Sequence, residues 1–435
     1  MTPFRAAAAS VDLVPQPGCW LTGFGARIYP SDGQHDPIMA RAVLLDDGVT
    51  PLVIVACDLI GISAQEIAVL RKRMVEQSRV PAMNIVISCS HTHSAPATLR
   101  FRGVLGYVNE RWWAAAQDKL VALVAGLEAQ LRPAHMSHAS TQVEGLSYNR
   151  QDQAHPIDTE LMAVAIDDVD GHAIATLVNF AVHPVTMSFG NLKLSGDVPG
   201  AVALELEERR GGVALYLQGA CGDVNPSTDL MTGWGNGTFE DVADMSRQLA
   251  EAAHVCLFNA PVLDSPKLGV AHATVDLPLD APPAADQVDA LFASFAQDMA
   301  TARQARNLTN ETTALSLLRW AGELKGAILN GTLPATTPIE VWTAAIGDLR
   351  LMAVPLEPYS DMALEFKKAV LPLRGMVLGY SNGLLGYCAS DWAKDQGGYG
   401  PDEACRWFPE QLTAVGYGAA QRVVEAGVGL VGGFK

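Results

Sequence analysis

The chain has 435 residues, of which 49% are hydrophobic and 18% are charged. This composition supplies enough apolar side chains for a large buried core and excludes an intrinsically disordered chain. The formal net charge is −17, and an acidic chain repels nucleic-acid phosphates and anionic lipid surfaces, so nucleic acid is not an expected partner. No stretch approaches the roughly 18 consecutive apolar residues that cross a bilayer, so membrane insertion is not expected.

Continuous apolar runs recur along the chain and alternate with helical patterns. Such runs, bounded by polar residues, predict strands buried on both faces, and they cover residues 51–58, 84–90, 161–168, 174–182, 212–219 and 349–355. The helical patterns cover residues 64–77, 109–131, 199–210, 239–258, 284–304 and 360–370, and the first of them follows a capping box at 63–66. The alternation predicts an α/β fold in which helices cover the sheets.

The segment 263–286 alternates apolar and polar residues and then reaches several prolines. This pattern predicts an edge strand followed by a linker. We expect the linker to lead into a helical insertion or cap at about residues 284–330, within a single domain that spans residues 1–435.

The stretch "VISCSHTHSAP" ends an apolar run with His91 and His93. Residues at positions i and i+2 of an extended chain point to the same face, so both imidazoles are expected to project together at the strand end. Such a pair is typical of a binding site, although a hydrogen-bonded pair at a strand end has the same spacing.

Other polar residues follow the predicted strands at the point where each strand ends, which is where open α/β sheets bind ligands. They are His183, Asp197, Asp223, Asn225 and Glu357, and a glycine-rich segment near the C-terminus adds Tyr380, Tyr387 and Tyr399. Structural roles are also open: a histidine bonded to a carbonyl, an acid at a helix N-terminus, an Asx-turn, and tyrosines that only pack.

Two or three histidines with one carboxylate form the ligand set of a catalytic zinc ion that keeps one position open. The sequence contains no H-E-x-x-H motif. A metal site must therefore be assembled from segments that are distant in the sequence.

Taken in order, these segments resemble the N-terminal catalytic domain of the neutral ceramidase family. "ISCSHTHSAPA" is similar to that family's T-H-T-H-S-G-P motif, "NFAVHPVTM" to its V-H-P segment and "GDVNPS" to its G-D-V-S-P-N turn. "VACDLIG" and "LSYNRQ" also match segments of the family, and weaker matches are "AVPLEPYSDMA" and the tyrosine pair twelve residues apart at 387 and 399.

The resemblance implies stacked mixed β-sheets flanked by α-helices and a single zinc ion. The implied zinc ligands are His91, His183, Glu357 and Tyr399. The implied residues around the reacting carbonyl are His93, Arg150 and Tyr387, of which His93 or Tyr387 would move the proton and all three could stabilise an oxyanion.

One position departs from the family pattern. Asn225 stands where ceramidases have a nucleophilic serine, and an amide side chain cannot form an acyl intermediate. We therefore predict a zinc-dependent hydrolase that cleaves an amide or ester bond through metal-activated water, with Asn225 positioning the reactants or donating a hydrogen bond.

The expected substrate is a small soluble molecule, because the sequence shows neither the secretory signal nor the C-terminal immunoglobulin-like domain of ceramidases. Seven cysteines without a C-x-x-C pair indicate a reducing compartment, so a cytoplasmic location is expected. A homo-oligomer is compatible with the sequence.

Three alternatives remain open at the level of the sequence. The first is a zinc-dependent lyase that acts on an acidic sugar, with Arg150 holding a carboxylate. The second is an amidohydrolase-type barrel, in which His135 and His138 would contribute. The third is an inactive metal-binding relative, suggested by Asn225. Asp58, Asp197 and Asp223 are expected to orient the histidines rather than to bind a second metal.

Overall fold

The computed structural model describes residues 4–103 and 105–434. Its strands form two main sheets. The larger sheet contains β1 (Arg5–Asp12), β3 (Met39–Asp46), β4 (Pro51–Cys57), β5 (Ile85–Cys89), β6 (Arg132–Gln142), β8 (Glu160–Asp168), β9 (Ala173–Phe180), β11 (Val213–Gln218) and β13 (Val262–Leu263). The smaller sheet contains β14 (Leu268–Pro278), β15 (Thr336–Ile346), β16 (Leu349–Ala353) and β18 (Arg374–Leu378).

The larger sheet has the order β11-β9-β8-β6-β1-β3-β4-β5, and β13 pairs with β6. The smaller sheet has the order β14-β15-β16-β18, with β14 at its edge as the alternating pattern predicted. Both sheets are mixed: β4–β5, β9–β11 and β16–β18 are parallel, and the other main pairs are antiparallel. The predicted fold of stacked mixed sheets flanked by helices is confirmed, and the amidohydrolase barrel is wrong for the described residues.

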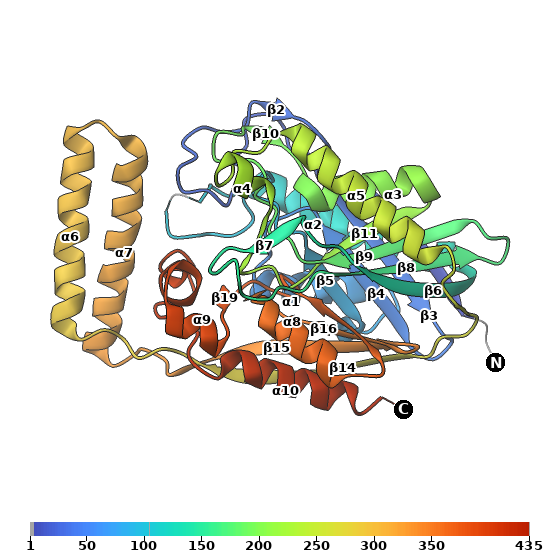
Figure 1. Cartoon of the computed structure of the whole chain (residues 1–435). Coiled ribbons are helices and arrows are strands. Elements are labelled where there is room, and N and C mark those ends of the chain that lie inside the picture. The colour runs from blue at the N-terminus through green and yellow to red at the C-terminus, as the bar shows by residue number, and fades with distance from the viewer. Residues whose placement is uncertain (1–3, 104, 435) are drawn as a thin grey trace.

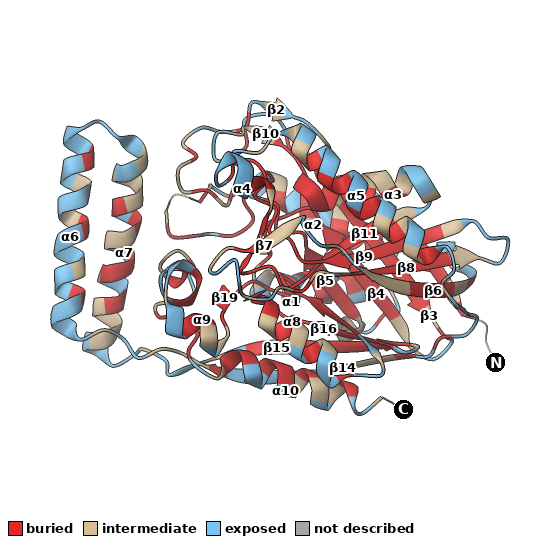
Figure 2. Ribbon diagram, viewed as in Figure 1, coloured by how far each residue is buried: buried red, intermediate tan, exposed pale blue. Residues whose placement is uncertain are grey.

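Helices cover the outer faces of both sheets (Figure 1). One apolar core joins β3, β4 and β5 to α1 (Ala64–Val75) and α2 (Glu110–Ala125). A second joins β8, β9 and β11 to α3 (Asp197–Arg210) and α5 (Phe239–Leu257). A third joins the smaller sheet to α8 (Ser360–Ala369) and α10 (Ala419–Val431). A fourth core fills the space between the sheets, and Figure 2 shows these strands as buried and the outer helix faces as exposed.

The helices α6 (Ala285–Gln304) and α7 (Leu308–Asn330) form an antiparallel pair at one end of the molecule (Figure 1). The pair has a small core of its own around Phe295 and Trp320. Its contacts with the rest of the chain include a hydrogen bond from the indole of Trp320 to the carbonyl of Leu412 (2.9 Å) and an ion pair between Arg102 and Glu323 (2.7 Å). Its description as an insertion or cap remains a prediction.

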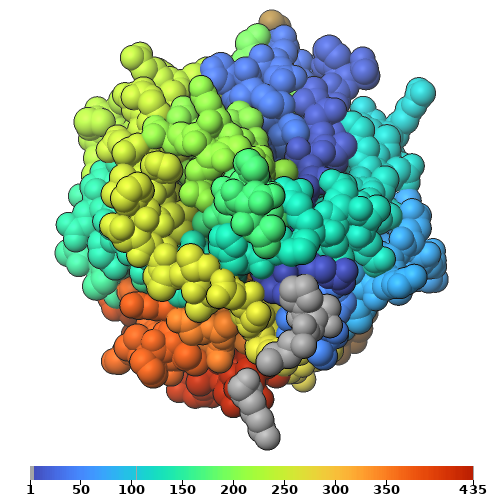
Figure 3. Space-filling view, turned by 90° about the vertical axis from the view of Figure 1, so that its right-hand side faces the viewer, coloured from blue at the N-terminus to red at the C-terminus, as the bar shows by residue number. Residues whose placement is uncertain are grey.

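The opposite end of the molecule is seen in Figure 3, where the C-terminal segments in orange and red lie below the earlier segments in blue to yellow. This arrangement matches the stacking of the smaller, late sheet against the larger, early one. None of the helices formed by the described residues is long and apolar enough to cross a membrane.

The six apolar runs became β4, β5, β8, β9, β11 and β16. The sequence did not predict β1, whose segment "RAAAASVD" contains four alanines and only one large apolar residue. Alanine has no strong preference for strands, so pairing with β3 over all eight residues decides this element.

Candidate metal centre

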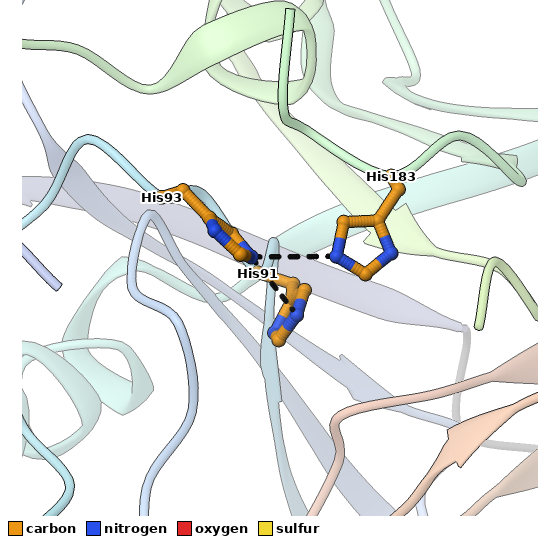
Figure 4. Close-up of side chains that lie close together, drawn as sticks. All are labelled: His91, His93 and His183. Atoms are coloured by element: carbon orange, nitrogen blue, oxygen red, sulfur yellow. Dashed lines mark hydrogen bonds between the residues drawn. The ribbon is translucent and has the colours of Figure 1, made fainter. Parts of the chain in front are cut away.

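Three imidazole rings converge on one point in the interior (Figure 4). Nε2 of His93 lies 3.4 Å from Nε2 of His91 and 3.3 Å from Nε2 of His183. These three side chains form a group that could hold a metal ion. His91 and His183 are buried, at 2% and 1% exposure.

The ends of two strands place these rings. His91 follows β5, and its backbone adopts a positive φ of 67°, which is uncommon for a residue other than glycine and is found mostly at functional sites. His183 follows β9, and its amide donates to the carbonyl of Val224 (2.8 Å). The two histidines of the "HTH" stretch do converge, but the expected reason is wrong: a left-handed turn brings them together, because the strand ends at Cys89.

Backbone carbonyls fix the tautomers of two rings. Nδ1 of His91 lies 2.7 Å from the carbonyl of Ile60, and Nδ1 of His183 lies 3.1 Å from the carbonyl of Cys221. A carbonyl oxygen can only accept, so each Nδ1 carries the proton and each Nε2 presents a lone pair to the cluster.

The prediction that Asp58, Asp197 and Asp223 orient the histidines is therefore not supported by these contacts. Asp58 accepts instead from the amide of Met39 and from Arg41. Asp223 accepts from Asn149 and from the amide of Ser360. The carboxylates hold neighbouring chain segments, and carbonyls hold the rings.

Glu357 completes the group from a short strand outside the two main sheets. It lies in β17 (Glu357–Pro358), just after β16, and is 2% exposed. Its Oε2 lies 3.2 Å from Nε2 of His91 and has no hydrogen-bond donor among the described residues. A buried carboxylate oxygen without a donor is strongly unfavourable unless a cation satisfies it.

The donor set fits a metal ion. His93 can carry at most one proton on Nε2, so at most one of its two contacts is a hydrogen bond and the remaining lone pairs repel one another. Two ligands bound to a tetrahedral zinc ion at about 2.0–2.1 Å lie about 3.3–3.4 Å apart. The observed separations of 3.4, 3.3 and 3.2 Å match this spacing.

The electrostatic environment favours the neutral form of His93 and His183. Burial lowers the pKa of His93 well below its usual value, and the neighbouring His91, Arg27 and Arg150 add to the effect. Burial also lowers the pKa of His183, with Arg150 as the next cause. Neutral imidazoles are the form that binds a metal ion.

Arg150 and two tyrosines lie beside this group. Nη2 of Arg150 donates to the carbonyl of Gly222 (2.6 Å) and lies 3.0 Å from the hydroxyl of Tyr387. Tyr387 lies in β19 (Tyr387–Cys388), which pairs with β17 so that Tyr387 stands opposite Glu357. The rings of Tyr387 and Tyr399 are 5.9 Å apart, and burial together with the charge of Glu357 raises the pKa of the Tyr387 phenol.

A cavity of about 780 Å³ opens onto the group, a volume typical of small-molecule sites. Five predicted site residues line it: His93, Arg150, His183, Tyr387 and Tyr399. His91 and Glu357 do not line the cavity. They lie behind its wall, where their donor atoms can bind the same metal ion. Thr309 and Thr313 of α7 also line this cavity.

Asn225 does not line this cavity. It lies in β12 (Val224–Pro226) and is 1% exposed. Its amide donates to Asp229 (2.7 Å), whereas its Oδ1 has no partner among the described residues. The structure brings Asn225 near the group but not to the surface that a substrate would touch.

The sequence analysis named Tyr380 without placing it beside a histidine, and it missed Phe24 and Gly23. The ring of Tyr380 stacks on His91 with centroids 4.1 Å apart, and the ring of Phe24 packs edge-on against His93 at 4.9 Å. Gly23 lies so close to His93 that a Cβ atom there would be 2.3 Å from Nδ1. The only sequence signal for the contact between Phe24 and His93 is the short "GFG" at 23–25, which has no helical or strand periodicity.

The fold and the site together define a layered α/β protein with a buried centre of three histidines and one glutamate that fits a metal ion. Residues 14–235, just over half of the chain, match the family model described as "Neutral/alkaline non-lysosomal ceramidase, N-terminal". The chain therefore belongs to this ceramidase family. The matched region contains the three histidines, Arg150 and Asn225, whereas Glu357 and the tyrosines lie beyond it.

Individual relatives are distant in sequence. The neutral ceramidase of Pseudomonas aeruginosa is 24% identical over 272 residues, which cover 57% of this chain and 40% of that protein. The neutral ceramidase of Mycobacterium tuberculosis is 25% identical over 249 residues, which cover 48% of this chain and 38% of that protein. The matched part thus spans less than half the length of these relatives.

The similarity in three dimensions extends over nearly the whole chain. The crystal structure of the P. aeruginosa neutral ceramidase has a TM-score of 0.73 at 18% identity, covering 98% of this chain and 74% of that one. A structure titled "Ceramidase complexed with C2" gives a TM-score of 0.72 at 17% identity, covering 98% and 75%. At this identity the likeness establishes the shared fold.

Proposed function

We propose that this protein is a metal-dependent hydrolase that cleaves an amide bond in an N-acylated substrate. The observation that carries the proposal is the set of lone pairs that face one another at 3.2–3.4 Å in the interior, on His91, His93, His183 and Glu357. Such a set is unfavourable without a cation, and its spacing suits zinc. Family membership supports amide hydrolysis as the reaction.

His91, His183 and Glu357 would hold the ion, as predicted. His93, which the sequence analysis assigned to catalysis, belongs to the same group, so it either binds the ion or faces the substrate beside it. When bound, zinc would polarise the substrate carbonyl and lower the pKa of a water molecule. The choice of zinc follows from the nitrogen and oxygen donors and from the three separations of 3.2–3.4 Å between them.

The residues around the cavity suggest how a substrate is held. Arg150 is a fixed cation on the cavity wall, and together with the hydroxyl of Tyr387 it supplies donors for an oxyanion. Tyr399 is 48% exposed and stands at the cavity surface. We retain Tyr399 as a candidate ligand and consider Tyr387, which stands opposite Glu357, as the alternative.

The role of Asn225 as a positioning group remains a proposal. Its contact with Asp229 and its absence from the cavity wall suggest that it acts through the loop at 221–226 rather than on the substrate directly. The lyase and inactive alternatives have no structural observation in their favour. A cytoplasmic location, a homo-oligomer and an ester as the alternative scissile bond likewise remain predictions.

The names of the relatives suggest ceramide-like substrates, that is, N-acylated amino alcohols. Apolar side chains on the cavity wall, among them Phe24, Leu105 and Trp234, suit an acyl chain. The sequence analysis expected a soluble substrate instead. Ceramides with short and long acyl chains, together with soluble N-acyl amino acids, distinguish the two expectations.

The test begins with the metal content of the purified native protein, of His91→Ala and of His183→Ala. The proposal expects one zinc ion per chain that both variants lose, and amide hydrolysis that a chelator abolishes and added zinc restores. The matched control is His138→Ala, because His138 pairs with Asp348 (2.7 Å) away from the cavity and its loss should leave the metal in place. A native protein that stays metal-free after reconstitution would overturn the proposal.

A further inference from the structure

Arg27 is a buried cation without a carboxylate partner. It is 3% exposed, and among residues 4–103 and 105–434 no aspartate or glutamate forms an ion pair with it. Burial lowers the pKa of this guanidinium to about 9, and no neighbouring acid opposes the shift. Burying an unpaired charge is strongly unfavourable, so a specific set of contacts must compensate for it.

Those contacts join three chain segments at one point. Nη1 of Arg27 donates to the carbonyl of Thr22 and to the carbonyl of His93, both at 2.8 Å. Nε donates to the carbonyl of Asn191 at 3.1 Å. Nη2 has no acceptor among the described residues. Arg27 thus ties the main chain of His93 to two other loops.

A second path leads from Arg27 to the ring of His93. The guanidinium carbon lies 5.0 Å from the centroid of Phe24, within the range of a cation–π contact. Phe24 also packs against the imidazole of His93, with ring centroids 4.9 Å apart. Phe24 therefore lies in contact with both Arg27 and the ring.

We propose that Arg27 is a positioning residue that fixes both the main chain and the imidazole of His93 in the histidine group. It acts on the backbone through its hydrogen bond to the carbonyl and on the ring through Phe24. It does not line the cavity, and it would not touch a substrate. The part of this inference that concerns metal affinity rests on the proposed function.

The geometry explains why arginine occupies this position. The guanidinium is a planar fork whose donors point in several fixed directions, so one side chain can reach carbonyls on three segments. A lysine ammonium is a single point at the end of a flexible stem. We therefore expect Arg27→Lys to preserve the charge without preserving the geometry.

The experiment compares Arg27→Met and Arg27→Lys with the control Arg71→Met. Arg71 is also buried, but it bonds the carbonyl of Ile85 at the start of β5 and pairs with Glu340, away from the histidines. Its loss measures the general effect of removing a buried arginine. Phe24→Leu serves as a further variant that keeps Arg27 and removes the ring between it and His93.

The first readout needs no metal. In metal-free protein with labelled histidines, the Cε1–H NMR signal of His93, assigned with His93→Gln, should be single in the native protein and in Arg71→Met. It should shift or split in Arg27→Met, Arg27→Lys and Phe24→Leu. The second readout is metal affinity by chelator competition, which should fall at least about 10-fold in the Arg27 variants and stay within 2-fold in Arg71→Met.

An unchanged His93 signal in a folded Arg27 variant would overturn the inference, whatever the metal affinity. If Arg27→Met does not fold, Phe24→Leu decides the same question through the ring. A native protein that binds no metal would overturn the proposed function but leave the NMR comparison intact. The two failures are therefore distinguishable.

Discussion

The carboxylate of Glu357 lies 3.2 Å from Nε2 of His91, and the strands that precede the two residues belong to different sheets. His91 follows β5 of the larger sheet, whereas Glu357 follows β16 of the smaller one. The proposed metal ion would therefore connect the two layers. Its removal should affect both the chemistry and the contact between the sheets.

Glu357→Gln should lower the affinity for zinc at least about 10-fold, because it replaces an anionic donor by a neutral one while keeping the shape. Competition with a chromophoric chelator measures the effect. Glu340→Gln is the control, since Glu340 pairs with Arg71 outside the cavity. Equal affinities in the two variants would show that Glu357 is not a ligand.

Tyr387→Phe and Tyr399→Phe should separate the two phenols. The variant that removes a ligand should lower metal affinity, and the variant that removes an oxyanion donor should lower kcat about 10- to 1000-fold with the metal retained. Metal content and steady-state kinetics of both proteins check this. Loss of neither property in either variant would exclude both tyrosines from the site.

The stability of the metal-free protein should decrease as the pH falls below about 6.5. Burial lowers the pKa of His93 and His183 in the folded state, so the unfolded chain takes up protons that the folded chain does not. The contribution of the two histidines to the free energy of unfolding is complete above pH 6.5. It is lost toward lower pH, at up to about 1.4 kcal/mol per pH unit for each ring. Urea unfolding at pH 7.5, 6.5 and 5.5 gives the free energy of unfolding as a function of pH. This free energy should change less with pH in His183→Gln than in the native protein. An identical pH dependence in the two proteins would show that His183 does not contribute.

Gly23→Ala should disrupt the site through a clash with His93 in addition to backbone strain. Gly23 has a φ of +92°, and an added Cβ would lie 2.3 Å from Nδ1 of His93. Gly18 has a similar φ of +86° with nothing within 4 Å, so Gly18→Ala measures the strain alone, about 1–2 kcal/mol. Gly23→Ala should unfold at a lower temperature than Gly18→Ala and bind metal more weakly. Equal behaviour of the two variants would mean that the contact with His93 does not matter.

The sequence by itself determined the α/β class, because short apolar runs rich in Val, Ile and Leu and bounded by polar residues are typical of buried strands, and the helical patterns between them are typical of helices that cover a sheet. It also indicated His91, His183 and Glu357 as candidates, because each stands where an apolar run stops. The family resemblance, now confirmed by the family model, added Arg150 and gave Tyr387 and Tyr399 their expected roles.

Only the tertiary structure decided how these residues meet. The left-handed turn at His91, the carbonyls of Ile60 and Cys221 that set the tautomers, and the buried Arg27 leave no periodic trace in the sequence. Each depends on contacts between loops that are far apart along the chain. Periodicity reports which face of an element is buried, whereas the direction of a side chain beyond a strand end depends on the backbone turn and its hydrogen bonds.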